Sequence, residues 1–218
     1  MEMSGLMGGF FRISVFISRL AYINILWIAF TLLGLVVLGV MPATVAMFAV
    51  MRKWIKGTSD FSVSRTYWRY YKKEFVQANL FGVFFVFIGY IIYANFVILS
   101  DQIMWMQVIR YVLLVITVIY LLSLLMFFPV YVHFDVKPID KLKVALMLTL
   151  SYPQYMILMA VTVVAVQYLV MYIPGLIPFF TCSLIGFTLM KIANIVFRIV
   201  SERNIQKEAK SKESVQAY

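Results

Sequence analysis

The single histidine of the chain, His133, lies two positions before an acidic residue, Asp135, at the end of an uncharged stretch. An imidazole and a carboxylate can bind a metal ion or relay a proton, so this pair is the first candidate for chemistry. One histidine and one aspartate are too few ligands for a metal site, and positions i and i+2 lie on different faces of a helix. The pair is therefore predicted to form a polar, interfacial end to a helix.

A basic and aromatic segment, SVSRTYWRYYKKE at 62–74, is the second candidate site. On a helix its cations would share one face and its aromatic rings another, which suits a helix that lies in the lipid headgroup layer. The residues predicted to contact anionic headgroups or an acidic partner are Arg65, Trp68, Arg69, Lys72 and Lys73. The alternative is that these charges only set the membrane topology and that the rings belong to an aromatic belt.

Polar side chains within the apolar stretches could line a pathway or join helices. No Asp, Glu or His lies deep in any of these stretches, so the buried carboxylate of a typical proton-coupled carrier is missing. The isolated amides are Asn24, Asn79, Asn95, Gln154, Gln167 and Asn194. Such amides usually hydrogen-bond between helices, although with Tyr and Trp they could also form an uncharged pathway for a sugar.

Sequence motifs for catalysis and for cofactor binding do not occur in this chain. It has no Walker, GxSxG or HExxH sequence and no paired catalytic carboxylates. The single cysteine, Cys182, excludes a disulfide framework and a CxxC metal site, and it is expected to be a small buried hydrophobe. We therefore predict that the protein is not an enzyme and needs no cofactor.

The composition is that of a membrane protein. Of the 218 residues, 64% are hydrophobic and 13% are charged, and the mean hydropathy is +0.95. Soluble domains have about 45–50% apolar and about 25% charged residues, so the excess apolar surface must face lipid. The net charge of +10 is then explained by loops beside anionic headgroups, and the sequence predicts no nucleic-acid partner.

Uncharged stretches define the spans of the predicted all-α fold, a polytopic transmembrane helical bundle. These stretches cover residues 20–51, 75–100, 111–134 and 144–190. A span needs about 20 residues to cross a hydrocarbon core of about 30 Å, so the second and third stretches are one span each. The last is too long and should break at Ile173-Pro174-Gly175 and Pro178. This break predicts spans at 144–172 and 176–198, the first of them kinked at Pro153.

The first stretch, 20–51, allows two interpretations because it is longer than one span and has basic residues on both flanks. The favoured one is a span from 20 to 40, a break near Gly39-Pro42, and a short half-helix at 43–56 that returns part-way. Both flanks would then be cytoplasmic. The rival is a single tilted helix kinked at Pro42, with the amino terminus outside. The favoured count is five spans plus a possible half-helix.

Positive charge is distributed unevenly over the connections. Segment 52–74 holds seven Lys or Arg residues and 133–143 holds three, whereas the opposite connections hold almost no charge. Because basic loops stay inside, we predict a multi-pass protein of the cell membrane with 52–74, 133–143 and the carboxyl terminus in the cytoplasm. The polar segment 201–218 is predicted to be a disordered tail after a single transmembrane domain at 1–200.

Four short pieces of the chain form a recognisable set. They are Pro42-Ala43-Thr44 as a turn, Arg52-Lys53-Trp54 with Gly57, the stretch 67–79, and Phe128-Pro129 to Phe134-Asp135 followed by Lys141 and Lys143. Over most of residues 10–200 they resemble the YesL-like family of bacterial integral membrane proteins of unknown function. Glu74 departs from this resemblance, because the family has Asn there, at a position with no known role.

The resemblance implies an accessory role near carbohydrate uptake, because members of the family often lie among genes for the uptake and breakdown of plant polysaccharides. The expected partners are the lipid bilayer, its anionic headgroups and the subunits of a sugar transporter. Two other functions remain open from the sequence. One is a channel or facilitator for a neutral solute such as a sugar, and the other is a membrane enzyme that acts on a lipid-linked substrate through His133 and Asp135.

Overall fold

The computed structural model describes residues 6–57, 61–98 and 104–216, and within these ranges it contains helices and no strand. This confirms the predicted all-α fold class. The helices in chain order are α1 (Leu6–Leu33), α2 (Val37–Ile55), α3 (Val63–Ile98), α4 (Met104–His133), α5 (Pro138–Ser151), α6 (Pro153–Tyr172), the short 3₁₀ helix η1 (Pro174–Leu176) and α7 (Ile177–Gln216).

Six helices among the described residues are long and apolar enough to cross a membrane. They are α1, α2, α3, α4, α6 and the helix that η1 forms with α7. The predicted polytopic transmembrane architecture is thereby confirmed, with α2 as a sixth candidate span where the sequence predicted a half-helix. The remaining helix, α5, has 14 residues, which is too short for a span.

The stretch 20–51 is a helical hairpin. Because α1 ends at Leu33 and α2 begins at Val37, the rival interpretation of a single kinked helix is wrong. The predicted break near Gly39-Pro42 is also misplaced, since the chain reverses before it. Leu35 and Val36 make the turn with positive φ angles of 55° and 64°, a backbone conformation that costs free energy for residues with a side chain.

Two glycines allow the backbones of α1 and α2 to touch beside this turn. A Cβ atom on Gly39 would overlap the Thr31 carbonyl of α1, and a Cβ atom on Gly34 would overlap Gly39. Gly39 therefore serves close packing within the hairpin and does not break α2.

Pro42 lies inside α2. Proline has no N–H group, so the Leu38 carbonyl one turn earlier loses its helical donor. Asn79 of α3 replaces that donor, because its Nδ2 donates to the Leu38 oxygen at 3.0 Å and to the Phe75 oxygen at 2.8 Å. With this carbonyl satisfied, α2 continues through the proline, and the predicted half-helix becomes a helix of 19 residues.

The two residues after Pro42 also join α2 to its neighbours. The Tyr67 hydroxyl of α3 donates to the Ala43 carbonyl at 2.6 Å, and the Trp27 indole of α1 donates to the Thr44 hydroxyl at 3.0 Å. The Pro-Ala-Thr piece that was expected to be a turn is therefore a helical segment that connects α1, α2 and α3.

The stretch predicted as one kinked span at 144–172 is two helices. α5 ends at Ser151 and α6 begins at Pro153. Tyr152 between them leaves the helical region, with φ −132° and ψ 56°. The residue before a proline is biased away from helical angles, so Pro153 starts a new helix and does more than kink an existing one.

The carboxyl-terminal segment differs from the prediction as well. α7 continues as a helix to Gln216, so most of the segment 201–218, predicted as a disordered tail, is helical. The division of the chain into one domain at 1–200 and a tail stays a prediction.

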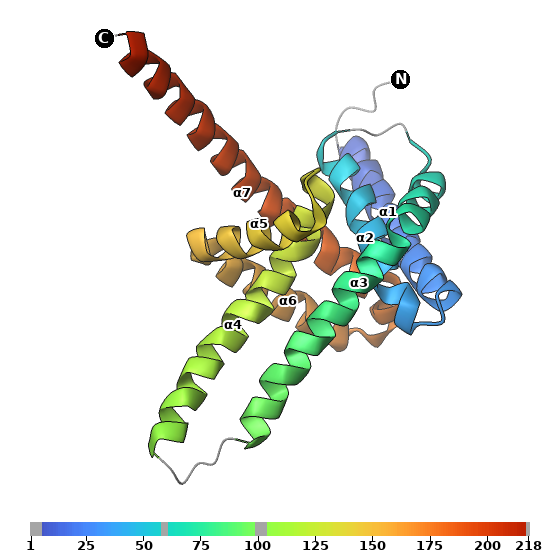
Figure 1. Cartoon of the computed structure of the whole chain (residues 1–218). Coiled ribbons are helices and arrows are strands. Elements are labelled where there is room, and N and C mark those ends of the chain that lie inside the picture. Colours follow the sequence, from blue (N-terminus) through green and yellow to red (C-terminus); the bar gives the residue numbers. More distant parts are fainter. Residues whose placement is uncertain (1–5, 58–60, 99–103, 217–218) are drawn as a thin grey trace.

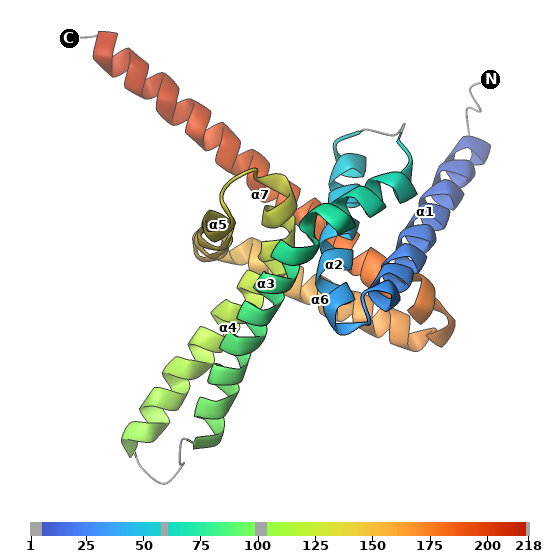
Figure 2. The same ribbon diagram turned by 45° about the vertical axis from the view of Figure 1, so that its right-hand side comes forward.

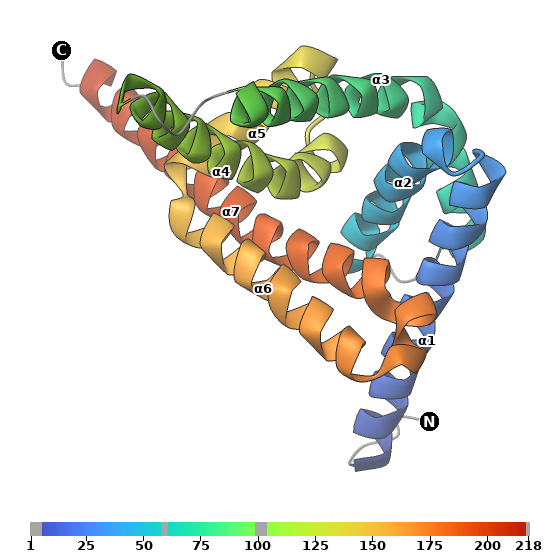
Figure 3. The ribbon, with the colours of Figure 1, turned by 90° about the horizontal axis from the view of Figure 1, so that it is seen from below.

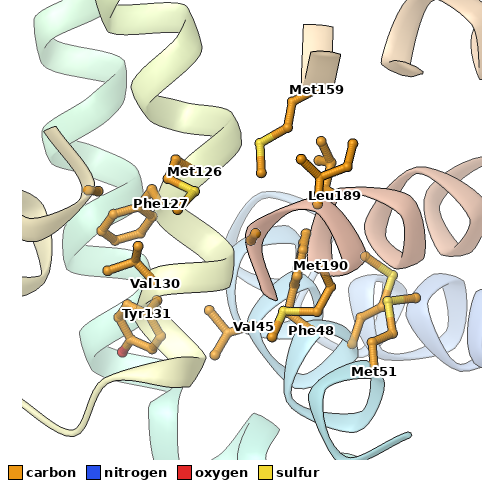
Figure 4. Close-up of a cluster of buried hydrophobic side chains, with 14 of the residues drawn as sticks. Val45, Phe48, Met51, Met126, Phe127, Val130, Tyr131, Met159, Leu189 and Met190 are labelled. Carbon is orange, nitrogen blue, oxygen red and sulfur yellow. The ribbon is translucent and has the colours of Figure 1, made fainter. Parts of the chain in front are cut away.

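α2 lies at the centre of the helices and contacts α1, α3, α4 and α7. Figure 4 shows buried side chains of α2 gathered with those of α4, α6 and α7. Glycines of the neighbouring helices make room for its methionines, because Met41 lies against Gly82 of α3 and Met47 against Gly186 of α7. Flexible thioether side chains fill such irregular spaces well.

The helix ends separate into two sides. The start of α1 and the ends of α2 and α7 lie on one side, whereas the α1–α2 turn and the end of α3 lie on the other (Figures 1 and 2). Seen from below, α6 and α7 run side by side (Figure 3). The end of α4 is next to the end of α2, since Arg52 donates to the His133 carbonyl. The basic segments 52–74 and 133–143 therefore meet.

Candidate functional site

Charged side chains gather in a cavity between the ends of α2 and α4, the first third of α3, and α5. This cavity has a volume of about 290 Å³. Its charged lining residues are Arg52, Lys73, Glu74, Asp135 and Lys141. Glu74 and Lys141 are each only 8% exposed, so charges from two helices are withdrawn from solvent around one space. Burial of a charge costs free energy unless a partner compensates it.

Tyr131 of α4 connects the two buried charges. Its hydroxyl donates to Glu74 Oε2 at 2.7 Å, and Lys141 Nζ lies 3.8 Å from the centroid of its ring. The other carboxylate oxygen of Glu74 lies 3.6 Å from Lys73 Nζ. Glu74 is thus held by a hydrogen bond and an ion pair, whereas Lys141 is held by the negative face of an aromatic ring.

The Lys141 ammonium is incompletely compensated. In the described part of the chain, no carboxylate lies within 4.0 Å of its Nζ. Burial lowers the pKa of Lys141 from its ordinary value, and the more distant charges of Glu74 and Asp135 offset that shift only in part. A buried ammonium in this situation favours any additional anion that reaches the cavity.

Arg52, near the end of α2, holds the end of α4. Its Nη2 donates to the His133 carbonyl at 3.0 Å, which is one of the carbonyls that a helix end leaves without a helical donor. Arg52 Nε and His133 Nδ1 are buried and have no hydrogen-bond partner among the residues that the structure describes. The His133 ring packs against Phe197 of α7, with centroids 4.2 Å apart. Two buried polar atoms beside the cavity are therefore unsatisfied.

His133 and Asp135 both line the cavity, although their spacing predicted different helix faces. The reason is that α4 ends at His133, so helical spacing does not apply to Asp135. Among the residues that the structure describes, no group of three or more His, Cys, Asp or Glu side chains could hold a metal ion. The pair belongs to the charged cavity.

The predicted contact for headgroups or a partner lies on the first turns of α3. Arg65, Trp68, Arg69 and Lys72 are exposed there, and Lys72 Nζ lies 5.5 Å from the Trp68 ring centroid. Trp68 therefore shares the surface of the cations, where the sequence predicted a separate aromatic face. Lys73 is also exposed but lines the cavity. We call Arg65, Trp68, Arg69 and Lys72 the basic face of α3.

The isolated amides differ in their contacts. Asn24 of α1 bonds to the backbone of α7 at 2.7 and 3.0 Å, and Asn79 joins α3 to α2. Asn95 donates to a carbonyl of its own helix at 2.8 Å. Gln154 and Gln167 lie exposed on α6. The first two amides therefore join helices, which is the usual role of such side chains in spans.

Sequence reasoning missed most of the charged cavity. From the sequence, Arg52 and Lys141 count as charges that set the topology, and Glu74 occupies a position without a known role. Glu74 gave one signal, since it is an acid among basic residues at the start of an apolar stretch. No sequence spacing relates it to Tyr131 and Lys141, which come from two other helices.

Six candidate spans with many exposed apolar side chains define a multi-span membrane protein. Within this class the chain belongs to the DUF624 family. Residues 20–96 match the family described as "Protein of unknown function, DUF624". The matched segment begins in α1 and ends near the end of α3, so it contains the helices that the Pro-Ala-Thr segment joins.

Three relatives from Bacillus subtilis (strain 168) extend the match over most of the chain. "Uncharacterized protein YteU" is 39% identical over 211 residues, or 97% of this chain and 95% of the relative. "Uncharacterized protein YesL" is 37% identical over 88% of this chain and 91% of its own length, and "Uncharacterized protein YesV" is 34% identical over 81% and 86%. The resemblance to the YesL-like family is thereby confirmed. No solved structure matches the chain.

Proposed function

We propose that the protein is a non-enzymatic membrane protein that assists a carbohydrate uptake system by binding one of its subunits. The family resemblance supports this role, since members often lie among genes for the uptake and breakdown of polysaccharides. The protein itself would carry no solute. The hydrogen bonds of Asn24 and Asn79 support this part of the proposal, because these amides are used to join helices.

The basic face of α3 is the observation that carries the proposal. Arg65, Arg69 and Lys72 form no ion pair within the described part of the chain, so three cations are available to an acidic surface. Trp68 beside them is 46% exposed, and tryptophan and arginine are the residues that most often anchor interfaces. An acidic segment of a transporter subunit, or a layer of anionic headgroups, complements this face.

Co-purification tests this function. Membranes from a strain with a tagged copy at its natural locus are dissolved in a mild detergent, and the proteins retained with the tag are quantified by mass spectrometry. We expect subunits of a sugar transporter, and we expect slower sugar uptake in a deletion strain. Recovery of the protein alone at full yield, together with unchanged sugar uptake after deletion, contradicts the proposal.

Charge variants locate the contact. The triple variant Arg65→Gln, Arg69→Gln and Lys72→Gln should lose the subunit, because it removes the three unpaired cations. A control that removes two cations elsewhere, Lys143→Gln with Arg198→Gln, should retain it, since these exposed cations already pair with acids of their own helices.

Two further measurements separate the alternatives. Solute flux into proteoliposomes that contain only this protein would support a facilitator and contradict the accessory role. A His133→Ala variant that loses function while it keeps its partner would support a membrane enzyme.

We also propose that segments 52–74 and 133–143 and the carboxyl terminus face the cytoplasm. Their positive charge supports this orientation. The α1–α2 hairpin then places the amino terminus on the same side. A reporter that is active only in the cytoplasm should give signal when it is fused to either terminus, and silence of both fusions at normal expression refutes the orientation.

A further inference from the structure

The charged cavity holds more positive than negative charge. Arg52, Lys73 and Lys141 line it together with Glu74 and Asp135, so three cations face two acids. Glu74 is occupied, since it accepts a hydrogen bond from the Tyr131 hydroxyl and pairs with Lys73. Asp135 is exposed and forms no ion pair in the described part of the chain. The cations Arg52 and Lys141 are therefore left without a paired acid.

The two cations differ in the contacts that their donors make. Lys141 Nζ lies over the Tyr131 ring. This is a cation–π contact and not a hydrogen bond to an oxygen or nitrogen acceptor. Arg52 uses one nitrogen for the neutral His133 carbonyl, and its Nε is buried without a partner in the described ranges of the chain. The ring Nδ1 of His133 is likewise buried and unpaired. Buried polar atoms without a partner, such as Arg52 Nε and His133 Nδ1, are rare because each one costs free energy.

The dimensions and position of the cavity limit the ligand. A volume of about 290 Å³ is at the lower end of small-molecule sites, which measure roughly 300–1,000 Å³. The cavity lies at the ends of α2 and α4, where the headgroup layer begins if these helices span the membrane. A guanidinium and an ammonium beside one small space suit a tetrahedral oxyanion with several acceptor oxygens.

From this geometry we infer that the cavity binds a phosphate group, which Lys141 and Arg52 contact directly and Lys73 supports from the rim. The Glu74–Tyr131 hydrogen bond acts as a positioning element, because it fixes the ring on which Lys141 lies. The phosphate belongs either to the headgroup of an anionic phospholipid or to a soluble phosphate. The inference does not depend on the proposed accessory function, since the basic face of α3 and the cavity are different surfaces.

Two ligands distinguish the sources. The full-length protein, stripped of lipid in mild detergent, is titrated with inorganic phosphate against sodium chloride of equal ionic strength while its melting temperature is followed. A second arm measures by native mass spectrometry how much phosphatidylglycerol remains bound, relative to a diglucosyl lipid with the same acyl chains and no phosphate. The variants are Lys141→Met and, as a matched control from the same helix, Lys143→Met. Lys143 is exposed and pairs with Asp140 at 3.7 Å.

We expect the wild type and Lys143→Met to bind the phosphate ligand and Lys141→Met to bind it about tenfold to a hundredfold more weakly, as for the loss of one charge-assisted hydrogen bond. A response in the phosphate arm alone assigns a soluble ligand, and a response in the lipid arm assigns a headgroup. Lys73→Met gives a second measurement if Lys141→Met does not fold. Equal responses of the wild type and both cavity variants, or no phosphate dependence in either arm, overturn the inference.

Discussion

Asn79 should contribute to stability because Pro42 removes a helical hydrogen-bond donor that Asn79 replaces. The Leu38 carbonyl has no helical donor in the native sequence, and Asn79 Nδ2 supplies one at 3.0 Å. Replacement of Asn79 by alanine therefore leaves this carbonyl without a donor within a candidate membrane span. A carbonyl that is unpaired and shielded from water costs about 1–3 kcal/mol in soluble proteins. Hydrogen bonds between helices of membrane proteins average about 0.6 kcal/mol and reach about 1.7 kcal/mol. We expect a loss near the upper value, since the proline cannot supply the missing donor.

A double-mutant cycle isolates this contact. In a Pro42→Ala background the alanine N–H can donate to the Leu38 oxygen, so Asn79→Ala should then cost little. The coupling between the two changes should be about 1–1.7 kcal/mol. The free energy of unfolding is measured for the four proteins by titration with denaturing detergent in mixed micelles, with helical circular dichroism as the signal. If Asn79→Ala costs the same in both backgrounds, Asn79 does not replace the missing donor and the account of α2 is wrong.

Three further changes test other parts of the structure. Gly39→Ala should destabilise the protein by about 1–3 kcal/mol, because its Cβ overlaps a carbonyl of α1, whereas Gly175→Ala meets no atom within 4 Å and should have little effect on the melting temperature. Tyr131→Phe should cost about 1–3 kcal/mol in the same unfolding assay, since it removes a donor from the buried Glu74 carboxylate. Lys141→Met should flatten the stability profile on the alkaline side. In the wild type, the pKa of Lys141 is lower in the folded protein than in the unfolded chain. Between these two pKa values the folded protein binds fewer protons than the unfolded chain, so the stability of the wild type rises with pH in this range. A rise of equal size in the variant refutes this.

Hydropathy predicted α3 and α4 well because a helix that faces lipid must be apolar along its length. The breaks were harder to place. Gly39 and Pro42 both carry local signals for the end of a helix, yet contacts with Thr31 and Asn79 allow α2 to continue through them. The real turn at 34–36 contains one glycine and two residues that disfavour positive φ. The position of this turn is therefore determined by the packing of α1 against α2 and not by local backbone preference.

The charged cavity shows a different limit of the sequence. Its members come from α2, α3, α4 and α5 or the segments beside them, so no spacing within one element predicts that they meet. The three cations of the basic face of α3 could be predicted because Arg65, Arg69 and Lys72 lie on consecutive turns of one helix, whereas Trp68 was predicted on a separate aromatic face. The sequence singled out His133 and Asp135 as a polar pair, and both line the cavity. Their shared cavity depended on the end of α4 at His133, a boundary that hydropathy does not fix.

The central position of α2 has a consequence for how the protein enters the membrane during synthesis. Of the six candidate spans in the described residues, α2 is the least apolar and the most buried, and it contains a proline. Such a segment inserts poorly on its own, because the insertion of a newly made helix depends on how apolar it is. α1 emerges before it and touches it backbone to backbone, so the two can insert as a pair. The central helix of the folded protein, α2, is thus the candidate span that depends most on a preceding helix, α1, for its insertion into the bilayer.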